Sequence, residues 1–288
     1  WVATSEGLLY LLMPLLDGGD LAVRIAAAAE AGTGPPALDA VCDWYAQALH
    51  GVSYLHWQGV LHQDLKPGNL LLASDERALQ ISDLGNAATL PGPGPHPAKR
   101  SVVKSRATCT LLYASPEVLL QEVHMAASDA WSLGVSFYEV LTLQPLFPPD
   151  TPVQLLRERA WGYDQELAVE ALSDGATEGG PERSQLVGEL SELLRRDPLR
   201  RPLAATLLRR PGTAERLRAV LFSGAAPEAW VSSQSEAHFQ LLQRLISESE
   251  AAADTDPPSE EATYRAGQSC PAEVAGASRR RSRGRRRR

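Results

Sequence analysis

The sequence predicts a mainly α-helical domain with a few short β-strands near its N-terminal end. Two observations carry this prediction. Over several long stretches, apolar residues recur at spacings of three and four, which is the period of an amphipathic helix. Short apolar runs between turn-forming residues, a pattern typical of buried strands, lie within the first 82 residues.

The expected strands surround one early helix. Leu8 to Met13 is a continuous apolar run, and the turn-rich stretch Pro14 to Gly19 follows it. A helix is predicted from Leu38 to Leu55, stopped by Gly59. Beyond it, short apolar pieces flank a polar centre between residues 60 and 72, and Leu79 to Ser82 is a further short strand.

In the second half of the chain, the sequence pattern predicts helices and no strands. Ser128 to Leu143 is apolar nearly all round, with Ser128 or Asp129 as its cap, so this helix is expected in the middle of the domain. Thr151 and Pro152 are expected as N-cap and first residue of a helix that runs to Ala160. A Gly-rich loop is expected from Asp174 to Glu182. Further helices are expected at Ser184–Arg196, Leu203–Arg210 and Glu236–Ile246.

Charge and cysteine content limit the classes of function that this chain can have. The net charge of the chain is −7, yet its last ten residues hold eight arginines, so an acidic body ends in a basic tip. An acidic body argues against a nucleic-acid surface across the domain. The Arg-rich end is a nuclear-import signal, an RNA-binding segment or an unstructured solvated run. Three widely spaced cysteines form no disulfide framework or CxxC metal pair, which favours a reducing compartment. No run of 18 apolar residues occurs, so no transmembrane helix is expected.

Polar side chains of useful chemistry gather in residues 62–69, HQDLKPGN, between two apolar runs. Asp64 can orient a hydroxyl group and accept its proton. Lys66 can neutralise a phosphoryl oxygen, and the amide oxygen of Asn69 can ligate Mg²⁺. Fourteen residues after Asn69, Asp83 follows a short strand and provides a second carboxylate for the metal.

These segments resemble the protein kinases, and the resemblance extends from residue 1 to about residue 222. It is specific because independent motifs occur in the order of that family. The matching segments are the catalytic loop at His62–Asn69, the metal-binding Asp83-Leu84-Gly85, the end of the activation segment at Thr110–Glu117, the start of a central helix at Asp129–Gly134, the late motif Asp197–Pro202, and the last N-lobe strand with the hinge at Leu8–Leu21.

The resemblance implies a truncated α+β kinase fold, with the helical large lobe present and the N-terminal lobe absent from the sequence. Residues 1–222 would form the kinase fragment, comprising hinge and C-lobe. Residues 223–247 would be a helical extension, and residues 248–288 a disordered tail with the Arg-rich end.

The same resemblance implies a Ser/Thr protein kinase that uses ATP and Mg²⁺ on protein substrates, in the cytoplasm or nucleus. Asp64 would be the catalytic base, and Lys66, which favours Ser/Thr acceptors, would contact the transferring phosphoryl group. Asn69 and Asp83 would hold the metal. The implied ATP-contacting residues are Met13 in the gatekeeper place, Leu16, Asp20 near the ribose, Lys66, Asn69 and Asp83. Thr110 would help to seat the substrate, and Glu117 and Arg201 would form a buried ion pair.

The sequence also departs from the family pattern. Gln63 stands where an arginine usually receives a phosphate from the activation segment, which weakens the expectation of that form of control. Pro14 lacks an N–H at a hinge position. No Gly-rich loop, strand lysine or helix glutamate precedes residue 1, so the alternative is a pseudokinase-like scaffold or binding module. Ser101, Ser105 and Thr108 are candidate phosphorylation sites.

Overall fold

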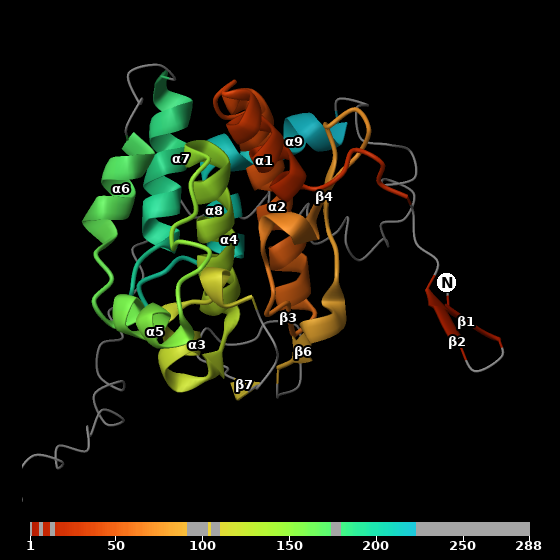
Figure 1. The fold of residues 1–288 in the computed structure, drawn as a ribbon. Helices are drawn as coiled ribbons and strands as arrows, with labels where there is room; N and C mark the ends of the chain where they lie inside the picture. Colours follow the sequence, from red (N-terminus) through yellow and green to blue (C-terminus); the bar gives the residue numbers. More distant parts are fainter. Residues whose placement is uncertain are drawn as a thin grey trace, which may run out of the picture. The chain divides into compact units, whose positions relative to one another are not determined.

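The computed structural model describes residues 2–5, 8–11, 15–90, 103–104, 110–173 and 180–222 (Figure 1). Within these ranges helices predominate. The helices are α1 (Leu21–Ala31), α2 (Leu38–Trp57), α3 (Pro116–Gln121), α4 (Ala126–Thr142), α5 (Val153–Trp161), α6 (Gln165–Ser173), α7 (Gly180–Leu193), α8 (Ala204–Leu208) and α9 (Pro211–Phe222). Short 3-10 turns are η1 (Pro67–Asn69), η2 (Leu84–Asn86) and η3 (Leu111–Tyr113). The mainly helical fold class is therefore confirmed.

The strands of the described residues form four antiparallel pairs. They are β1 (Val2–Ser5) with β2 (Leu8–Leu11), β3 (Val60–Leu61) with β6 (Ala88–Thr89), β4 (Leu70–Leu72) with β5 (Leu79–Ile81), and β7 (Val103–Lys104) with β8 (Val123–His124). The pair β4–β5 matters most for the site, because it pairs Leu70 with Ile81 and brings the residues just outside it, Asn69 and Ser82, next to each other.

Helices α2 and α4 form the centre of the core. The side chains of Trp131, Leu133 and Phe137 on α4 are fully buried, as are Val41 and Leu49 on α2. Helix α2 packs against α4, α8, α9 and β5, and α4 also contacts α6 and α7. Buried apolar area of this kind is the main stabilising term in a domain, so these two helices supply the rigid support for the loops at their ends.

The central helix differs from its prediction at the start. Helix α4 begins at Ala126 with Met125 as N-cap, so the assignment of Ser128 or Asp129 as the cap is wrong. Ser128 is instead the third helical residue, and its hydroxyl oxygen accepts a hydrogen bond from the Met125 N–H at 3.1 Å. Asp129 is buried inside the domain and serves a different purpose. By contrast, the predicted helix at Leu38–Leu55 is confirmed as α2, with Gly59 just beyond it at φ 72°.

Other helix boundaries also differ between the prediction and the structure. Helix α5 begins at Val153 with Pro152 as N-cap, one residue later than expected. The expected loop at Asp174–Glu182 is wrong for its last three residues, which open α7. Helix α1 was not expected, although its buried residues Leu21 and Ile25 keep the helical spacing of four. Asp20 starts this helix by accepting a hydrogen bond from the Val23 N–H at 2.9 Å.

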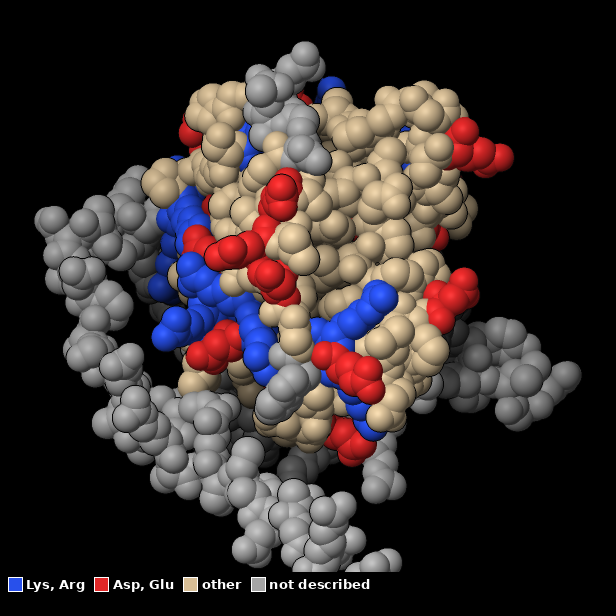
Figure 2. Space-filling view, turned by 60° about the vertical axis from the view of Figure 1, so that its left-hand side comes forward, with Lys and Arg blue, Asp and Glu red and all other residues tan. Residues whose placement is uncertain are grey.

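Several expectations fall on residues outside the described ranges. They are Met13 and Pro14, the phosphorylation candidates Ser101, Ser105 and Thr108, the helical extension 223–247 and the tail 248–288. Among the described helices, none combines the length and apolar content that a membrane span requires. On the face shown in Figure 2, Lys and Arg side chains lie interspersed with Asp and Glu, unlike the single-sign stripe of many nucleic-acid-binding domains.

Candidate active site

A buried carboxylate on α4 fixes the start of the loop at residues 62–69. Asp129 accepts hydrogen bonds from the backbone N–H groups of His62 and Gln63, each at 2.9 Å, and lies 2.8 Å from Nε2 of His56. Burial alone would raise the pKa of Asp129, but these donors outweigh burial and lower it. The Asp129 carboxylate thus holds the backbone at the start of the loop, where Gln63 has a positive φ of 66°.

Asp64, Lys66 and Thr110 form a closed triangle of hydrogen bonds. Lys66 Nζ donates to Asp64 Oδ2 at 2.8 Å and to Thr110 Oγ1 at 2.9 Å. The Thr110 backbone N–H donates to Asp64 Oδ1 at 2.8 Å. Thr110 is 46 residues from Asp64 in sequence, so the triangle joins the loop to the segment before α3. The predicted grouping of these three residues is what the structure shows.

The ionisation state of Asp64 follows from this triangle. Burial tends to raise the pKa of Asp64, whereas the hydrogen bonds from Lys66 and Thr110 favour the charged form and lower the pKa below its ordinary value. At neutral pH the side chain is therefore a carboxylate with two committed donors. A carboxylate of low pKa orients a hydroxyl group well and is a weak base.

A second set of contacts ties Asn69 to Ser82, the residue before Asp83. The side-chain N–H of Asn69 donates to the backbone oxygen of Asp64 at 2.7 Å, and the backbone N–H of Ser82 donates to the backbone oxygen of Asn69 at 2.9 Å. Nε2 of His62 lies 2.9 Å from the Ser82 carbonyl oxygen, so this nitrogen carries the proton. Asp83 follows at φ 61° and is exposed, its Oδ1 accepting from the Gly85 N–H at 3.1 Å.

The segment expected as hinge lies against the same hairpin. The backbone of Gly18 and Gly19 exchanges hydrogen bonds with Leu72 at 3.1 and 2.8 Å, and Asp20 forms an isolated bridge with Leu71. A Cβ on Gly18 would lie 2.1 Å from the backbone oxygen of Ala73, so only glycine permits this approach. Asp20 is half-exposed here, as is Leu16, and caps α1.

Comparisons with known proteins agree with this geometry. A family model described as "Protein kinase domain" matches residues 2–211. The chain is 30% identical over 220 residues to serine/threonine-protein kinase Nek1 of Mus musculus, covering 75% of this chain and 16% of the relative. It is 30% identical over 214 residues to Nek3 of the same organism, covering 73% and 37%. It is 43% identical over 115 residues to cyclin-dependent kinase B1-1 of Arabidopsis thaliana, covering 38% and 34%.

The chain belongs to the protein kinase family. Its relatives by sequence are serine/threonine kinases, which supports the Ser/Thr class. The chain spans between about a sixth and two fifths of the length of the curated relatives just described.

The ion pair expected in a kinase between Glu117 and Arg201 is present. Two guanidinium nitrogens meet the two carboxylate oxygens at 2.6 and 2.8 Å, and both side chains are buried. Ser128 donates a further hydrogen bond to Glu117 at 2.8 Å. Arg201 also donates to the backbone oxygens of Ala127, Arg195 and Arg196 and lies 4.9 Å from the ring centre of Trp131. Burial would raise the pKa of Glu117, but Arg201 outweighs it and lowers the pKa.

Sequence reasoning missed some residues of this kinase site. It treated His56 as an ordinary helix residue and Asp129 as a cap, although together they anchor the loop. One signal was available, since Asp129 is a lone acid at the start of a helix without a polar face. The contact of the Tyr113 hydroxyl with Glu139 Oε2 at 2.7 Å was also missed, because 26 residues and a turn separate the two in sequence.

Proposed function

We propose that this chain is the catalytic large lobe of a serine/threonine protein kinase that transfers the γ-phosphoryl group of ATP to a protein hydroxyl. The observation that carries the proposal is the triangle of Asp64, Lys66 and Thr110. A carboxylate and an ammonium group held 2.8 Å apart on one edge of a loop suit a reaction in which a hydroxyl attacks a charged phosphoryl group.

In this mechanism the carboxylate of Asp64 accepts a hydrogen bond from the Ser or Thr hydroxyl and aims its oxygen at the phosphorus. The new O–P bond forms as the bond between the γ-phosphorus and the bridging oxygen breaks, and ADP leaves. The hydroxyl proton passes to Asp64 late in the transfer, because a carboxylate of low pKa is a weak base early on. Lys66, 29% exposed at its side chain, can turn toward the phosphoryl oxygens and offset their charge.

The candidate metal ligands fit Mg²⁺ in kind. The Asn69 amide nitrogen is committed to the Asp64 carbonyl, so the amide oxygen is the acceptor left for a cation, and Asp83 adds an exposed carboxylate. Within the part of the chain that the structure describes, no three His, Cys, Asp or Glu side chains gather as a metal site. Mg²⁺ is commonly held by one or two protein oxygens together with substrate phosphates, and when bound it neutralises charge on those phosphates.

ATP recognition would rest on the segment from Met13 to Asp20. Gly18 and Gly19 fasten this segment to β4, directly after Asn69, so the proposed adenine and ribose contacts and the proposed metal ligands share one hairpin as support. Leu16 and Asp20 lie in the described part of this segment. Asp20 Oδ1 caps α1, which leaves Oδ2 as the oxygen for a ribose hydroxyl.

The decisive experiment measures phosphate transfer from labelled ATP to a Ser/Thr peptide library, using the chain joined to an N-terminal lobe of the family. We expect Asp64→Asn and Asp83→Ala to abolish transfer, whereas Asp75→Asn, an exposed turn residue, leaves it unchanged. Unaltered turnover in Asp64→Asn would refute the assignment.

The second function, a pseudokinase-like binding module, is separated from the first by nucleotide binding. If the chain is a scaffold that does not bind nucleotide, Mg-ATP leaves its thermal unfolding midpoint unchanged. Asp64→Asn then also leaves the capture of a partner protein unchanged. A midpoint that rises with Mg-ATP and ceases to rise in Asp83→Ala supports the kinase. The expected absence of an N-terminal lobe stays a prediction, which the coding sequence upstream of residue 1 tests directly.

A further inference from the structure

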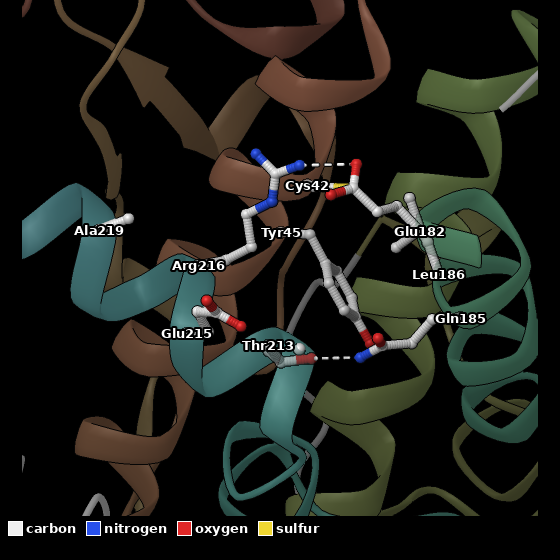
Figure 3. A pocket seen from close by; sticks show the side chains of 10 residues that line it. Cys42, Tyr45, Glu182, Gln185, Leu186, Thr213, Glu215, Arg216 and Ala219 are labelled. Carbon is white, nitrogen blue, oxygen red and sulfur yellow. Dashed lines mark hydrogen bonds and ion pairs between the residues drawn. The ribbon is translucent and has the colours of Figure 1, made fainter. Parts of the chain in front are cut away.

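A cavity of about 430 Å³ lies between α2, α7 and α9, on elements that carry none of the proposed catalytic or metal-binding residues (Figure 3). Cys42 and Tyr45 of α2, Glu182 and Leu186 of α7, and Arg216 and Ala219 of α9 line it. Its volume falls in the range of sites that accept small organic molecules. The apolar part of its wall is formed by Leu186, Ala219, the Cys42 thiol and the Tyr45 ring.

The one cation in the lining is already saturated. Arg216 pairs with Asp39 at 2.7 Å, Asp43 at 3.3 Å and Glu182 at 2.8 Å. Three carboxylates therefore pair with a single guanidinium group, and the Glu215 carboxylate lines the same cavity. Figure 3 shows Arg216 and Glu182 meeting at one end of the cavity. The field left over is negative, so it attracts a positive ligand and repels an anion.

The inner wall contains a buried hydroxyl group, that of Tyr45, which lacks a well-formed hydrogen bond. Tyr45 is 3% exposed, and its ring packs edge-on against Phe137 at 5.2 Å. Its hydroxyl group forms no hydrogen bond of good geometry among the described residues, although burial and the nearby Glu189 carboxylate raise its pKa. In Figure 3 the ring stands beside the cavity and its hydroxyl is directed toward the pair formed by Gln185 and Thr213. A buried hydroxyl without a well-formed hydrogen bond costs free energy, and a ligand that bonds to it recovers part of this cost.

The thiol of Cys42 reports the same environment. Burial, in the presence of Glu182, Asp43 and Asp39, raises the pKa of Cys42 to about 11, against the opposing influence of Arg216. Its thiol is consequently neutral at physiological pH, and it adds no negative charge and no ready nucleophile. The acidic groups of the mouth thus supply the charge, and the interior supplies apolar contact and one hydroxyl.

We propose that the cavity between α2, α7 and α9 binds a small organic cation, an ammonium group attached to an apolar or aromatic body. The ammonium group lies at the mouth beside Glu182 and Glu215, and the apolar body lies against Tyr45 and Leu186, with a polar atom of the ligand bonded to the Tyr45 hydroxyl. This site is independent of phosphate transfer and goes beyond the proposed function.

A matched series of probes tests the charge requirement. We would titrate 2-phenylethylammonium, its neutral analogue 2-phenylethanol and the anion 3-phenylpropanoate against the 288-residue chain by saturation-transfer NMR. The cation should bind roughly tenfold more tightly than the alcohol, the effect of one charge-assisted hydrogen bond, and the anion should show no saturable binding. Equal binding of the three probes, or none, overturns the proposal.

Cysteine labelling locates the binding. At mildly alkaline pH, where part of the Cys42 thiol ionises, N-ethylmaleimide modification of Cys42, followed by peptide mass spectrometry, should slow when 2-phenylethylammonium is present. Cys109 and Cys270 in the same sample serve as rate references. Unchanged labelling of Cys42 at a saturating probe concentration places any binding elsewhere and refutes this site.

Two variants separate ligand contacts from folding. Glu182→Gln should remove most of the preference for the cation, whereas Glu158→Gln, an exposed glutamate on α5, should retain it. Tyr45→Phe keeps the ring and loses only the hydroxyl, so its thermal midpoint should not fall while binding of tyramine, a cation with a polar ring substituent, weakens. Equal effects of Glu182→Gln and Glu158→Gln contradict the assignment of the mouth.

Discussion

Asp64 and Glu117 are both buried carboxylates paired with a cation, yet the two pairs are built differently. Around Glu117, Arg201 is fully buried and donates to five oxygens, three of them backbone carbonyls. Around Asp64, the cation is Lys66, whose side chain is 29% exposed and whose ammonium group has two partners. A planar guanidinium in a closed cage fixes structure, whereas a mobile ammonium at an open edge can exchange one partner for a substrate.

The largest expected effect comes from breaking the closed pair. Glu117→Ala leaves the Arg201 guanidinium buried without its counter-ion, and we expect a loss of about 3–5 kcal/mol in the free energy of unfolding. Urea denaturation followed by circular dichroism measures it. A loss below about 1 kcal/mol, the size typical of an exposed ion pair, would contradict the description of a closed cage.

A double variant sharpens this comparison. Replacing a whole buried ion pair by apolar residues is often neutral. Here Glu117→Met with Arg201→Met also strands the carbonyl oxygens of Ala127, Arg195 and Arg196 that Arg201 satisfies. We therefore expect the double variant to remain destabilised by about 2 kcal/mol, the cost of unpaired buried acceptors. Full recovery of wild-type stability in the denaturation curve would show that those carbonyl bonds contribute little.

The open pair predicts a smaller effect that depends on pH. The pKa of Asp64 is lower in the folded chain than in the unfolded chain, so its charged form stabilises the fold above the ordinary carboxylate pKa, and this stabilisation is lost as pH falls through the folded value. Asp64→Asn should thus cost about 1 kcal/mol at neutral pH, and the difference from wild type should shrink below about pH 4. Paired unfolding curves over this range test it, with Asp75→Asn as the control.

The smallest effect concerns the residue between the two networks. Both side-chain polar atoms of Gln63 are buried without a hydrogen-bonding partner among the described residues. Gln63→Leu preserves the size of the side chain and the backbone bond to Asp129, so it should stabilise the fold by about 1 kcal/mol. A lower thermal unfolding midpoint in this variant would indicate that the amide has a partner in the folded protein.

Much of the active site could be predicted because its residues are close in sequence. Asp64, Lys66 and Asn69 lie in one polar stretch between apolar runs, and Asp83 follows the adjacent strand, so local chemistry and spacing sufficed. The pairing of Glu117 with Arg201, 84 residues apart, was predictable only through the family resemblance. The role of Asp129 was not predicted, since an acid near a helix start is equally suited to a cap, and only packing decides between the two.

The fold beyond the site shows the same division. Helix α2 was predictable because many large apolar residues keep the helical period along its 20 residues, whereas in α1 the pair Leu21 and Ile25 stands among alanines. The cavity by Tyr45 is lined by three helices spread over some 180 residues of sequence, from Cys42 to Ala219. No local sequence pattern predicts such a cavity, because its shape depends on how the helices cross.

Ser82 connects several groups of the site, so these groups are expected to open together. Its N–H bonds to the backbone of Asn69 and its carbonyl oxygen lies beside the ring of His62, so one residue fastens both proposed metal ligands and the loop that holds Asp64. Opening of the β4–β5 hairpin would release these groups in a single event rather than one after another. The amide hydrogens of Leu72 and Ser82 should accordingly exchange with solvent deuterium at a common rate, as one cooperative unit.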